Sequence, residues 1–460
     1  MATNPQTTAP GAARAPGPTY QEIVQRDHSP PPAPFLDYSY EFLGDEDIPY
    51  SSYTSREYAH EEFAKLWPRV WQMACREEHI AAPGDYHVYD IGNLSAIVTR
   101  TESGAIKAYF NACMHRGTAL KAAQSSGTCA NFRCPFHGWT YSLDGKLINL
   151  PERWDFPHVT DDSHNLRELK VDTWAGFVFV NFDQDCESLQ TFLGVLPAHF
   201  AGFRIEDRYI ETHVCKRLPV NWKAAQEAFM EAYHVKETHA GGREFSEPIT
   251  TYDVYPKNVN RFIHTVGAPN PRMPRAPTEA ELMQQLWGRR GPADGDVPTV
   301  PDGMTARDVY ADIIKKQLGE HYDQDFSNYS TAQTLDSIEY FLFPNLFVFP
   351  GLSLPMAYRF RPDKDDPDFC YFDLFFLRPK HPVKTPPPPP EPLQLDVADS
   401  YTMAQGLGFL GPVYDQDTGN MAAQTVGFKT SAKGGQTLGN YQEVRARHLH
   451  MRVNDYLAAK

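Results

Sequence analysis

Two short stretches decide how this chain is interpreted: Cys113-Met-His115-Arg-Gly and Cys134-Pro-Phe-His137-Gly-Trp. Each places a cysteine and a histidine two or three residues apart, so a tight turn can bring both onto one metal unit. Two thiolates hold one iron as ferric, and two neutral imidazoles on a second iron raise the reduction potential of a [2Fe–2S] cluster. A zinc site with two cysteines and two histidines would use the same residues.

The residues around the second loop decide between these alternatives. From Cys134 to Gly145 the pattern is Cys-Pro-x-His-Gly-Trp-x-Tyr-x-x-Asp-Gly. Together with Cys-x-His-Arg-Gly in the first loop, it closely resembles the Rieske domain. The resemblance implies that a [2Fe–2S] cluster is bound by Cys113, His115, Cys134 and His137. The gap between the two loops is slightly longer than usual in that family, which predicts a small insertion.

A second group of candidate ligands lies in segment 221–239. We expect a helix here, with three candidate side chains on one face: Glu227, Glu231 and His234. His239 lies five residues beyond His234, so it reaches the same metal only if the helix ends or unwinds between them. Ala240-Gly241-Gly242 follows directly and is a credible stop.

Two histidines and one carboxylate on one face of an iron leave positions open for dioxygen. The segment resembles the catalytic-domain motif of Rieske oxygenases, acidic-x-x-His-x-x-x-x-His. This resemblance implies that His234 and His239 bind a mononuclear Fe(II). It makes Glu231 the carboxylate that links this iron to the cluster, where most relatives have Asp. Glu227 would then support the ligands from behind.

The third ligand is expected far downstream, in Gly411-Pro-Val-Tyr-Asp415-Gln-Asp417-Thr-Gly-Asn420-Met421. This stretch resembles the family's segment Gly-x-x-x-x-x-Asp-x-x-Asn-Met. Alignment on Asn420-Met421 selects Asp417, while Asp415 stays open in what we expect to be a flexible loop. The nearby segment 406–411 matches G-x-G-x-x-G, but a proline and no helix follows, so no dinucleotide site is expected.

Composition excludes several classes. The 460 residues are enough for two domains. A net charge of −15 argues against non-specific nucleic-acid binding, which needs basic side chains. The longest apolar stretch, 341–358, is interrupted by prolines, so no membrane span is expected. Seven cysteines without an apolar leader indicate a reducing, cytoplasmic compartment rather than a disulfide framework.

The pattern along the chain predicts an α+β protein with three regions. Residues 1–44 form a Pro-rich, mobile N-terminal arm, and 45–190 form an all-β Rieske domain with a leading helix over 58–71. Residues 191–460 form a catalytic domain that resembles the helix-grip fold, with a helix over 441–457. The expected strands are 86–91, 96–99, 106–111, 174–181, 338–349, 357–361 and 369–377.

The resemblance implies the oxygenase component of a multicomponent system that uses O2. Electrons from NAD(P)H reach it through a separate reductase, with or without a ferredoxin. It also implies a homotrimer, with or without a β subunit, in which His137 of one chain approaches Glu231 of the next.

The sequence indicates the class of substrate less specifically than it indicates the metal ligands. Aromatic and apolar residues near the metal segment and along a strand are either core or pocket lining: Phe229, Met230, Tyr233, Phe341, Phe343, Phe347 and Phe349. If they line a pocket, the substrate is an apolar aromatic or a polycyclic, steroid-like molecule. Two alternatives stay open: an oxidative demethylase of the same family, and a non-catalytic helix-grip binding module joined to a Rieske electron carrier.

Overall fold

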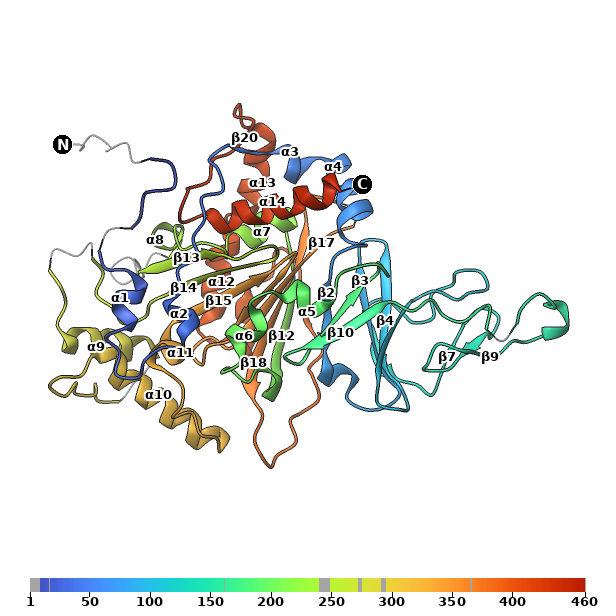
Figure 1. Ribbon diagram of the computed structural model, residues 1–460, viewed down its shortest axis with the longest axis horizontal. Coiled ribbons are helices and arrows are strands. Elements are labelled where there is room, and N and C mark those ends of the chain that lie inside the picture. The colour runs from blue at the N-terminus through green and yellow to red at the C-terminus, as the bar shows by residue number, and fades with distance from the viewer. Residues whose placement is uncertain are drawn as a thin grey trace.

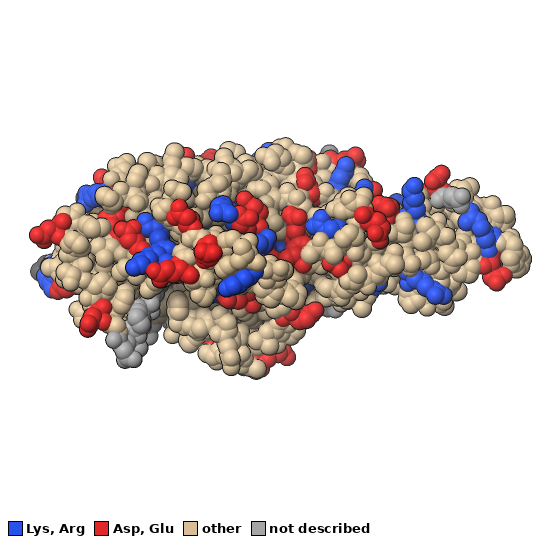
Figure 2. Space-filling view, turned by 90° about the horizontal axis from the view of Figure 1, so that it is seen from below, with Lys and Arg blue, Asp and Glu red and all other residues tan. Residues whose placement is uncertain are grey.

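The computed structural model describes residues 9–15, 17–160, 162–239, 249–271, 275–290, 295–364 and 366–459. The molecule is elongated, with a large part that holds most helices and a narrower β part at the other end (Figure 1). On the face seen in Figure 2, acidic and basic side chains are interspersed, without a broad basic area. None of the helices in the described ranges combines the length and apolarity needed to cross a membrane.

The large part is built on a sheet of eight strands in the described residues, in the order β13-β14-β15-β16-β17-β18-β12-β19. Neighbours are antiparallel, except that β12 and β19 are parallel. The strands are β12 (Arg208–Leu218), β13 (Thr250–Val254), β14 (Val259–His264), β15 (Ser337–Leu342), β16 (Leu346–Phe349), β17 (Met356–Pro362), β18 (Cys370–Pro379) and β19 (Leu393–Leu395).

Helices surround this sheet (Figure 1). They are α1 (Tyr20–Val24), α2 (Ala33–Leu36), α3 (Ser51–Thr54), α4 (Arg56–Glu61), the π-helix η1 (Glu62–Leu66), α5 (Leu189–Leu193), α6 (Leu196–Phe200), α7 (Trp222–Glu227), α8 (Val235–Thr238), α9 (Glu279–Arg290), α10 (Ala306–Tyr322), α11 (Thr331–Leu335), α12 (Leu410–Gly419), α13 (Met421–Thr430) and α14 (Val444–Ala458). A short pair of strands, β1 (Ile48–Pro49) and β20 (Gly435–Gln436), joins the two ends of the chain.

The C-terminal helix α14 packs on β13 and β14. Its Leu449 and Val453 are fully buried, and Arg445 forms a buried ion pair with Glu339 of β15 at 2.6 Å. Nη1 of Arg445 also donates to the carbonyl of Met230 at 3.0 Å. A buried ion pair that lost one partner would be costly, so this contact holds α14 in register with the segment that follows α7.

The narrow part contains three small sheets in the described residues, with orders β5-β4-β3-β6, β7-β8-β9 and β10-β11-β2. The strands are β2 (Gln72–Arg76), β3 (Asp85–Ile91), β4 (Leu94–Arg100), β5 (Ile106–Phe110), β6 (Ser126–Thr128), β7 (Phe132–Arg133), β8 (Thr140–Tyr141), β9 (Leu147–Asn149), β10 (Lys170–Trp174) and β11 (Phe177–Asn181). Strands β7 and β9 lie at the far end of the molecule (Figure 1).

Two predicted strands are each a hairpin. Segment 174–181 belongs to β10 and β11, which reverse at Ala175-Gly176, where φ is 52° and 77°. Two consecutive residues with positive φ make the tight turn that suits the twist of a hairpin. Segment 338–349 is likewise divided between β15 and β16. An alanine in a left-handed position is a weak turn signal, so the sequence pattern did not reveal the first reversal.

The N-terminal arm was expected to be mobile, and this prediction is wrong for its described residues from 19 to 37. Val24 and Phe35 are fully buried in the main core. Asp27 pairs with Arg307 of α10 at 3.0 Å, and Arg307 pairs with Asp336 at 2.8 Å. A Pro-rich composition indicated disorder, but a few apolar anchors and one buried ion pair are enough to attach the segment. The domain boundaries after residues 44 and 190 stay predictions.

Candidate metal centres

Two similar turns present the candidate cluster ligands. The N–H of Gly117 donates to the carbonyl of Cys113 at 2.9 Å, and the N–H of Gly138 donates to that of Cys134 at 3.1 Å. Both glycines have positive φ, 77° and 74°, a conformation that other residues rarely adopt. Each turn therefore closes directly behind its cysteine and histidine.

The two turns face each other. The ring centroids of His115 and His137 are 4.7 Å apart, and Trp139 stacks on His115 at 5.0 Å. Both cysteines are buried and unbridged, whereas His137 is exposed. Inner thiols and outer imidazoles fit a cluster with one iron held by each kind of ligand.

Tyr141 adds a polar contact to this centre. Its hydroxyl oxygen lies 3.3 Å from Sγ of Cys113 and accepts from the N–H of Met114 at 3.0 Å. Its own hydrogen is then free to point at the sulfur. Burial raises the pKa of the Cys113 thiol, so an ionised sulfur there needs the positive charge that iron supplies.

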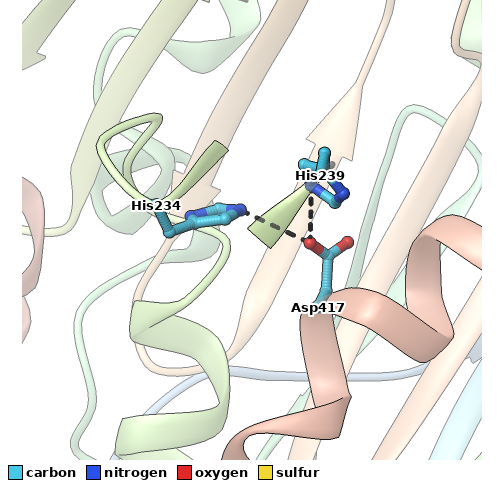
Figure 3. Close-up of side chains that lie close together, drawn as sticks. All are labelled: His234, His239 and Asp417. Carbon is cyan, nitrogen blue, oxygen red and sulfur yellow. Dashed lines mark ion pairs between the residues drawn. The ribbon is translucent and has the colours of Figure 1, made fainter. Parts of the chain in front are cut away.

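The second candidate site brings together His234, His239 and Asp417 (Figure 3). Oδ1 of Asp417 lies 3.4 Å from Nε2 of His234 and 3.0 Å from Nε2 of His239. One possible ligand atom from each of the three residues lies within 4.8 Å of the others. The side chains are largely buried, with exposed fractions of 25%, 18% and 9%. This is the ligand set expected from the sequence.

The other ring nitrogens show that the set fits a cation. Nδ1 of His234 lies 2.6 Å from Oε1 of Glu231, and Nδ1 of His239 lies 2.8 Å from Oε1 of Gln416. Carboxylate and carboxamide oxygens only accept hydrogen bonds, so each Nδ1 carries the hydrogen and each Nε2 presents a lone pair. Oδ1 of Asp417 is buried without a hydrogen-bond donor in the described residues. Three lone pairs that converge in this way fit a divalent metal.

The pKa values agree that positive charge is favoured here. Burial lowers the pKa of His234, but the nearby carboxylates of Asp417 and Glu231 outweigh it and raise the pKa to about 10. The carboxylate of Asp417 likewise raises the pKa of His239. Burial alone would raise the pKa of Asp417, yet the two imidazoles hold it below its usual range.

Segment 221–239 is not the continuous helix expected from the sequence. Helix α7 ends at Glu227, and α8 begins only at Val235. Oε2 of Glu231 accepts from the N–H groups of Tyr233 and His234, so this side chain satisfies two backbone donors just before α8 begins. The predicted stop at residues 240–242 lies outside the described residues.

Asp417 and Asp415 lie on helix α12, where the sequence predicted a flexible loop. Side chains two positions apart on a helix point in different directions. Asp415 accepts from Oγ of Ser400 at 2.5 Å and from the N–H of Tyr401 at 2.9 Å. The helix therefore directs Asp417, and not Asp415, toward the two histidines.

Glu227 does not contact the candidate iron ligands. Its Oε1 lies 2.6 Å from Nε2 of His450 on α14 and accepts from the hydroxyl of Tyr53 at 2.9 Å. Its Oε2 accepts from Nε2 of Gln436 at 2.8 Å. Burial raises the pKa of Glu227, but these partners outweigh it and hold the pKa below its usual range. Glu227 was expected to support the iron ligands. In the structure it instead links α7 to residues near both ends of the chain.

A cavity of about 410 Å³ lies beside this site. It is lined by Glu227, Glu231, His234, Asp417 and Glu443 among others. Carboxylates form part of its wall, and apolar side chains form another part: Ala224, Ala228, Met421, Leu438 and Ala446.

The aromatic residues singled out in the sequence lie mainly in the core. Four phenylalanines of the hairpin formed by β15 and β16 are almost fully buried: Phe341, Phe343, Phe347 and Phe349. Met230 is buried, and Tyr233 is 65% exposed. Phe229 packs on Tyr358 and Phe372, with ring centroids 5.5 Å and 5.2 Å away, and on Tyr414 of α12 at 6.3 Å. Through Tyr414, Phe229 contacts the helix that carries Asp417.

Three residues near the two sites had no role in the sequence interpretation: Tyr141, Gln416 and His450. Tyr141 was part of the quoted loop pattern, and Gln416 immediately precedes Asp417. Their positions could have attracted attention, but their contacts depend on side chains that are distant in sequence. His450 was one of 17 histidines, without a spacing signal.

Comparison with known proteins agrees with both centres. The family description "Ring hydroxylating alpha subunit (catalytic domain)" matches residues 201–459, and "Rieske [2Fe-2S] domain" matches 70–160. The first match covers more than half of the chain, so the protein belongs to the ring-hydroxylating alpha-subunit family. The predicted α+β fold, a Rieske domain followed by a catalytic domain, is confirmed. This combination carries a [2Fe–2S] cluster and a mononuclear iron.

The particular relatives are oxygenase subunits. The chain is 32% identical over 202 residues to chlorobenzene dioxygenase subunit alpha of Cupriavidus sp. (strain PS12), which is 41% of this chain and 44% of the relative. It is 27% identical over 222 residues to the carnitine monooxygenase oxygenase subunit of Escherichia coli (strain K12), 48% and 56% of the two chains. The chain spans about half the length of the curated relatives it matches.

Solved structures show the same fold. A quaternary ammonium Rieske monooxygenase in complex with L-carnitine aligns with a TM-score of 0.62 and 16% identity, covering 89% of this chain and 95% of the other. Naphthalene 1,2-dioxygenase from Rhodococcus sp., bound to indole, aligns with a TM-score of 0.61 and 19% identity, covering 90% and 95%.

Proposed function

We propose that this chain is the oxygenase component of a multicomponent Rieske oxygenase that hydroxylates an organic substrate with O2. The main support for this proposal is that lone pairs of His234, His239 and Asp417 converge on one point. The same chain also contains a Rieske domain. When bound, the cluster supplies electrons and the mononuclear iron activates dioxygen. The assignment of all seven ligands is part of the proposal: Cys113, His115, Cys134 and His137 for the cluster, and His234, His239 and Asp417 for the iron.

The side chains of the second site have different proposed roles. His234, His239 and Asp417 would hold the iron from one side, and a metal held by two histidines and one carboxylate would keep positions open for dioxygen. Glu231 orients His234 through Nδ1 and borders the cavity beside the site. We assign to Glu231 the link between the two metal centres.

The two centres of one chain are far apart. Helix α8 and strands β7 and β9 lie toward opposite ends of the long axis (Figure 1). We therefore propose a ring of three chains in which His137 of one chain approaches Glu231 of the next, through the cavity beside Glu231. A separate reductase, with or without a ferredoxin, would bring electrons from NAD(P)H. The ring could form with or without a β subunit.

The proposed substrate is an apolar aromatic or a polycyclic, steroid-like molecule. A relative named for an aromatic substrate, chlorobenzene dioxygenase subunit alpha, supports this class. A second candidate is oxidative demethylation, because one relative is an N,N-dimethyl phenylurea N-demethylase subunit, 30% identical over 198 residues. Hydroxylation of an N-methyl carbon would then release it as an aldehyde.

The test starts with metal and acid-labile sulfide content, and a visible spectrum, on anaerobically purified protein. We expect about three irons and two sulfides per chain. The reduced protein is then mixed with ¹⁸O2 and a panel of aromatic and N-methyl compounds, and ¹⁸O in the products is measured by mass spectrometry. His234→Ala should lose this incorporation and keep the cluster spectrum.

Three outcomes would contradict the proposal. Zinc without sulfide would remove the Rieske assignment. Two irons per chain, with tight ligand binding and no oxygen uptake, would favour a binding module joined to an electron carrier. Loss of the cluster spectrum in His234→Ala would mean that this histidine serves the other metal.

A further inference from the structure

The two candidate histidine ligands are held by different partners. Nδ1 of His234 faces the carboxylate of Glu231 at 2.6 Å, whereas Nδ1 of His239 faces the carboxamide of Gln416 at 2.8 Å. Gln416 immediately precedes Asp417 on α12. One helix therefore contacts the ring of His239 on both sides, through Gln416 at Nδ1 and Asp417 at Nε2.

The orientation of His239 needs such a contact. His239 is the C-cap residue of α8, with φ −100° and ψ 87°. Because this backbone is not helical, the helix does not set the direction of the imidazole ring. An imidazole that binds a metal through Nε2 must carry its hydrogen on Nδ1, and that hydrogen needs an acceptor. Within the described residues, the acceptor for Nδ1 of His239 is Oε1 of Gln416.

On the basis of the proposed function, we infer that Gln416 is a positioning residue for the mononuclear iron. Its carboxamide oxygen holds His239 with Nε2 toward the metal. Because this partner is neutral while that of His234 is anionic, His239 is the weaker electron donor of the two imidazoles.

The charge balance explains a glutamine at this position. A divalent iron with the carboxylates of Asp417 and Glu231 is formally neutral. A third carboxylate, at position 416, would make this largely buried site negative, which would bind the iron more tightly and oppose the arrival of an electron. Glutamine provides the same hydrogen-bond acceptor without that charge.

The experiment measures iron release, which does not depend on turnover. Anaerobic holoprotein is mixed with an excess of a ferrous chelator, and release from the mononuclear site is followed while the visible spectrum monitors the cluster. Gln416→Leu removes the acceptor, and Gln416→Glu keeps it and adds charge. Gln405→Leu, at another exposed glutamine just before α12, is the matched control.

We expect Gln416→Leu to release iron about 10- to 100-fold faster than wild type, Gln416→Glu more slowly than wild type, and Gln405→Leu at the wild-type rate. The electron paramagnetic resonance signal of the nitric oxide complex of the ferrous site should also change in Gln416→Leu, since the ring is no longer oriented. Gln416 is exposed, so both substitutions should leave the fold intact.

The result would overturn the inference if Gln416→Leu released iron at the wild-type rate, or if Gln416→Glu released it as fast as Gln416→Leu. A different failure, wild-type protein with an intact cluster and no mononuclear iron, would contradict the proposed function itself. The two failures are therefore distinguishable in one experiment.

Discussion

Nε2 of His450 on the C-terminal helix lies 2.6 Å from Oε1 of Glu227, at the end of α7. Tyr53 and Gln436 bind the same carboxylate, so a single buried side chain joins both ends of the chain to the element that precedes the iron ligands. We expect this cluster of four residues to make part of the protein's stability depend on pH.

Glu227→Gln should destabilise the protein by about 1–3 kcal/mol at neutral pH, since it removes a buried, charge-assisted set of hydrogen bonds. The pKa of Glu227 is held below its usual value of 4.5. Its contribution is therefore fully present above about pH 4.5 and is lost as pH falls through the lower, folded-state value. The difference between wild type and variant should narrow over that acid range, and Glu61→Gln, at an exposed site, should show no such difference. Urea unfolding at several pH values checks this, and a difference that is independent of pH would contradict it.

Asp417→Asn should lose the mononuclear iron, because an amide is a much weaker ligand than a carboxylate. Asp415→Asn, on the same helix, is the matched control and should keep all the iron, since Asp415 serves Ser400 and Tyr401. Iron and sulfide content of both variants distinguishes them. Iron loss from the Asp415 variant alone would reverse the assignment.

Glu231→Gln should keep both metals and slow electron transfer from cluster to iron by about 10- to 100-fold. A glutamine keeps one acceptor for Nδ1 of His234 but loses the charge that couples the two imidazoles. Stopped-flow reoxidation of the reduced cluster with O2 and substrate measures the rate. A normal rate would remove the linking role of Glu231.

Tyr141→Phe should lower the reduction potential of the cluster. The Tyr141 hydroxyl donates toward Sγ of Cys113, and such a bond stabilises the more negative, reduced cluster. A bond of about 1 kcal/mol corresponds to about 40 mV for one electron. Tyr109→Phe removes another buried hydroxyl, which donates to a backbone carbonyl, and is the control. A redox titration in which both variants shift equally would show that the sulfur contact has no particular effect.

The sequence by itself determined the family, and it predicted the kinds of ligand and the residues that supply them. Cysteine–histidine spacing within one turn is a local property, and so is the separation of His234 from His239. Strand and helix positions such as α14 followed from periodicity, because a stripe of apolar residues reports its own local geometry. The sequence analysis missed two local features, the turn at Ala175 and the break between α7 and α8. Both depend on single residues and not on a repeated pattern.

Only the tertiary structure placed Asp417, and not Asp415, beside the two histidines. It also packed part of the N-terminal arm against the core and gave Glu227, Gln416 and Tyr141 their partners. Whether α12 is a helix, and which of its sides faces α8, depends on packing against Ser400, Tyr401 and the aromatic core. A motif lists residues in order but not the rotation of the helix that carries them, and a rotation of about 100° per residue separates a ligand from its neighbour.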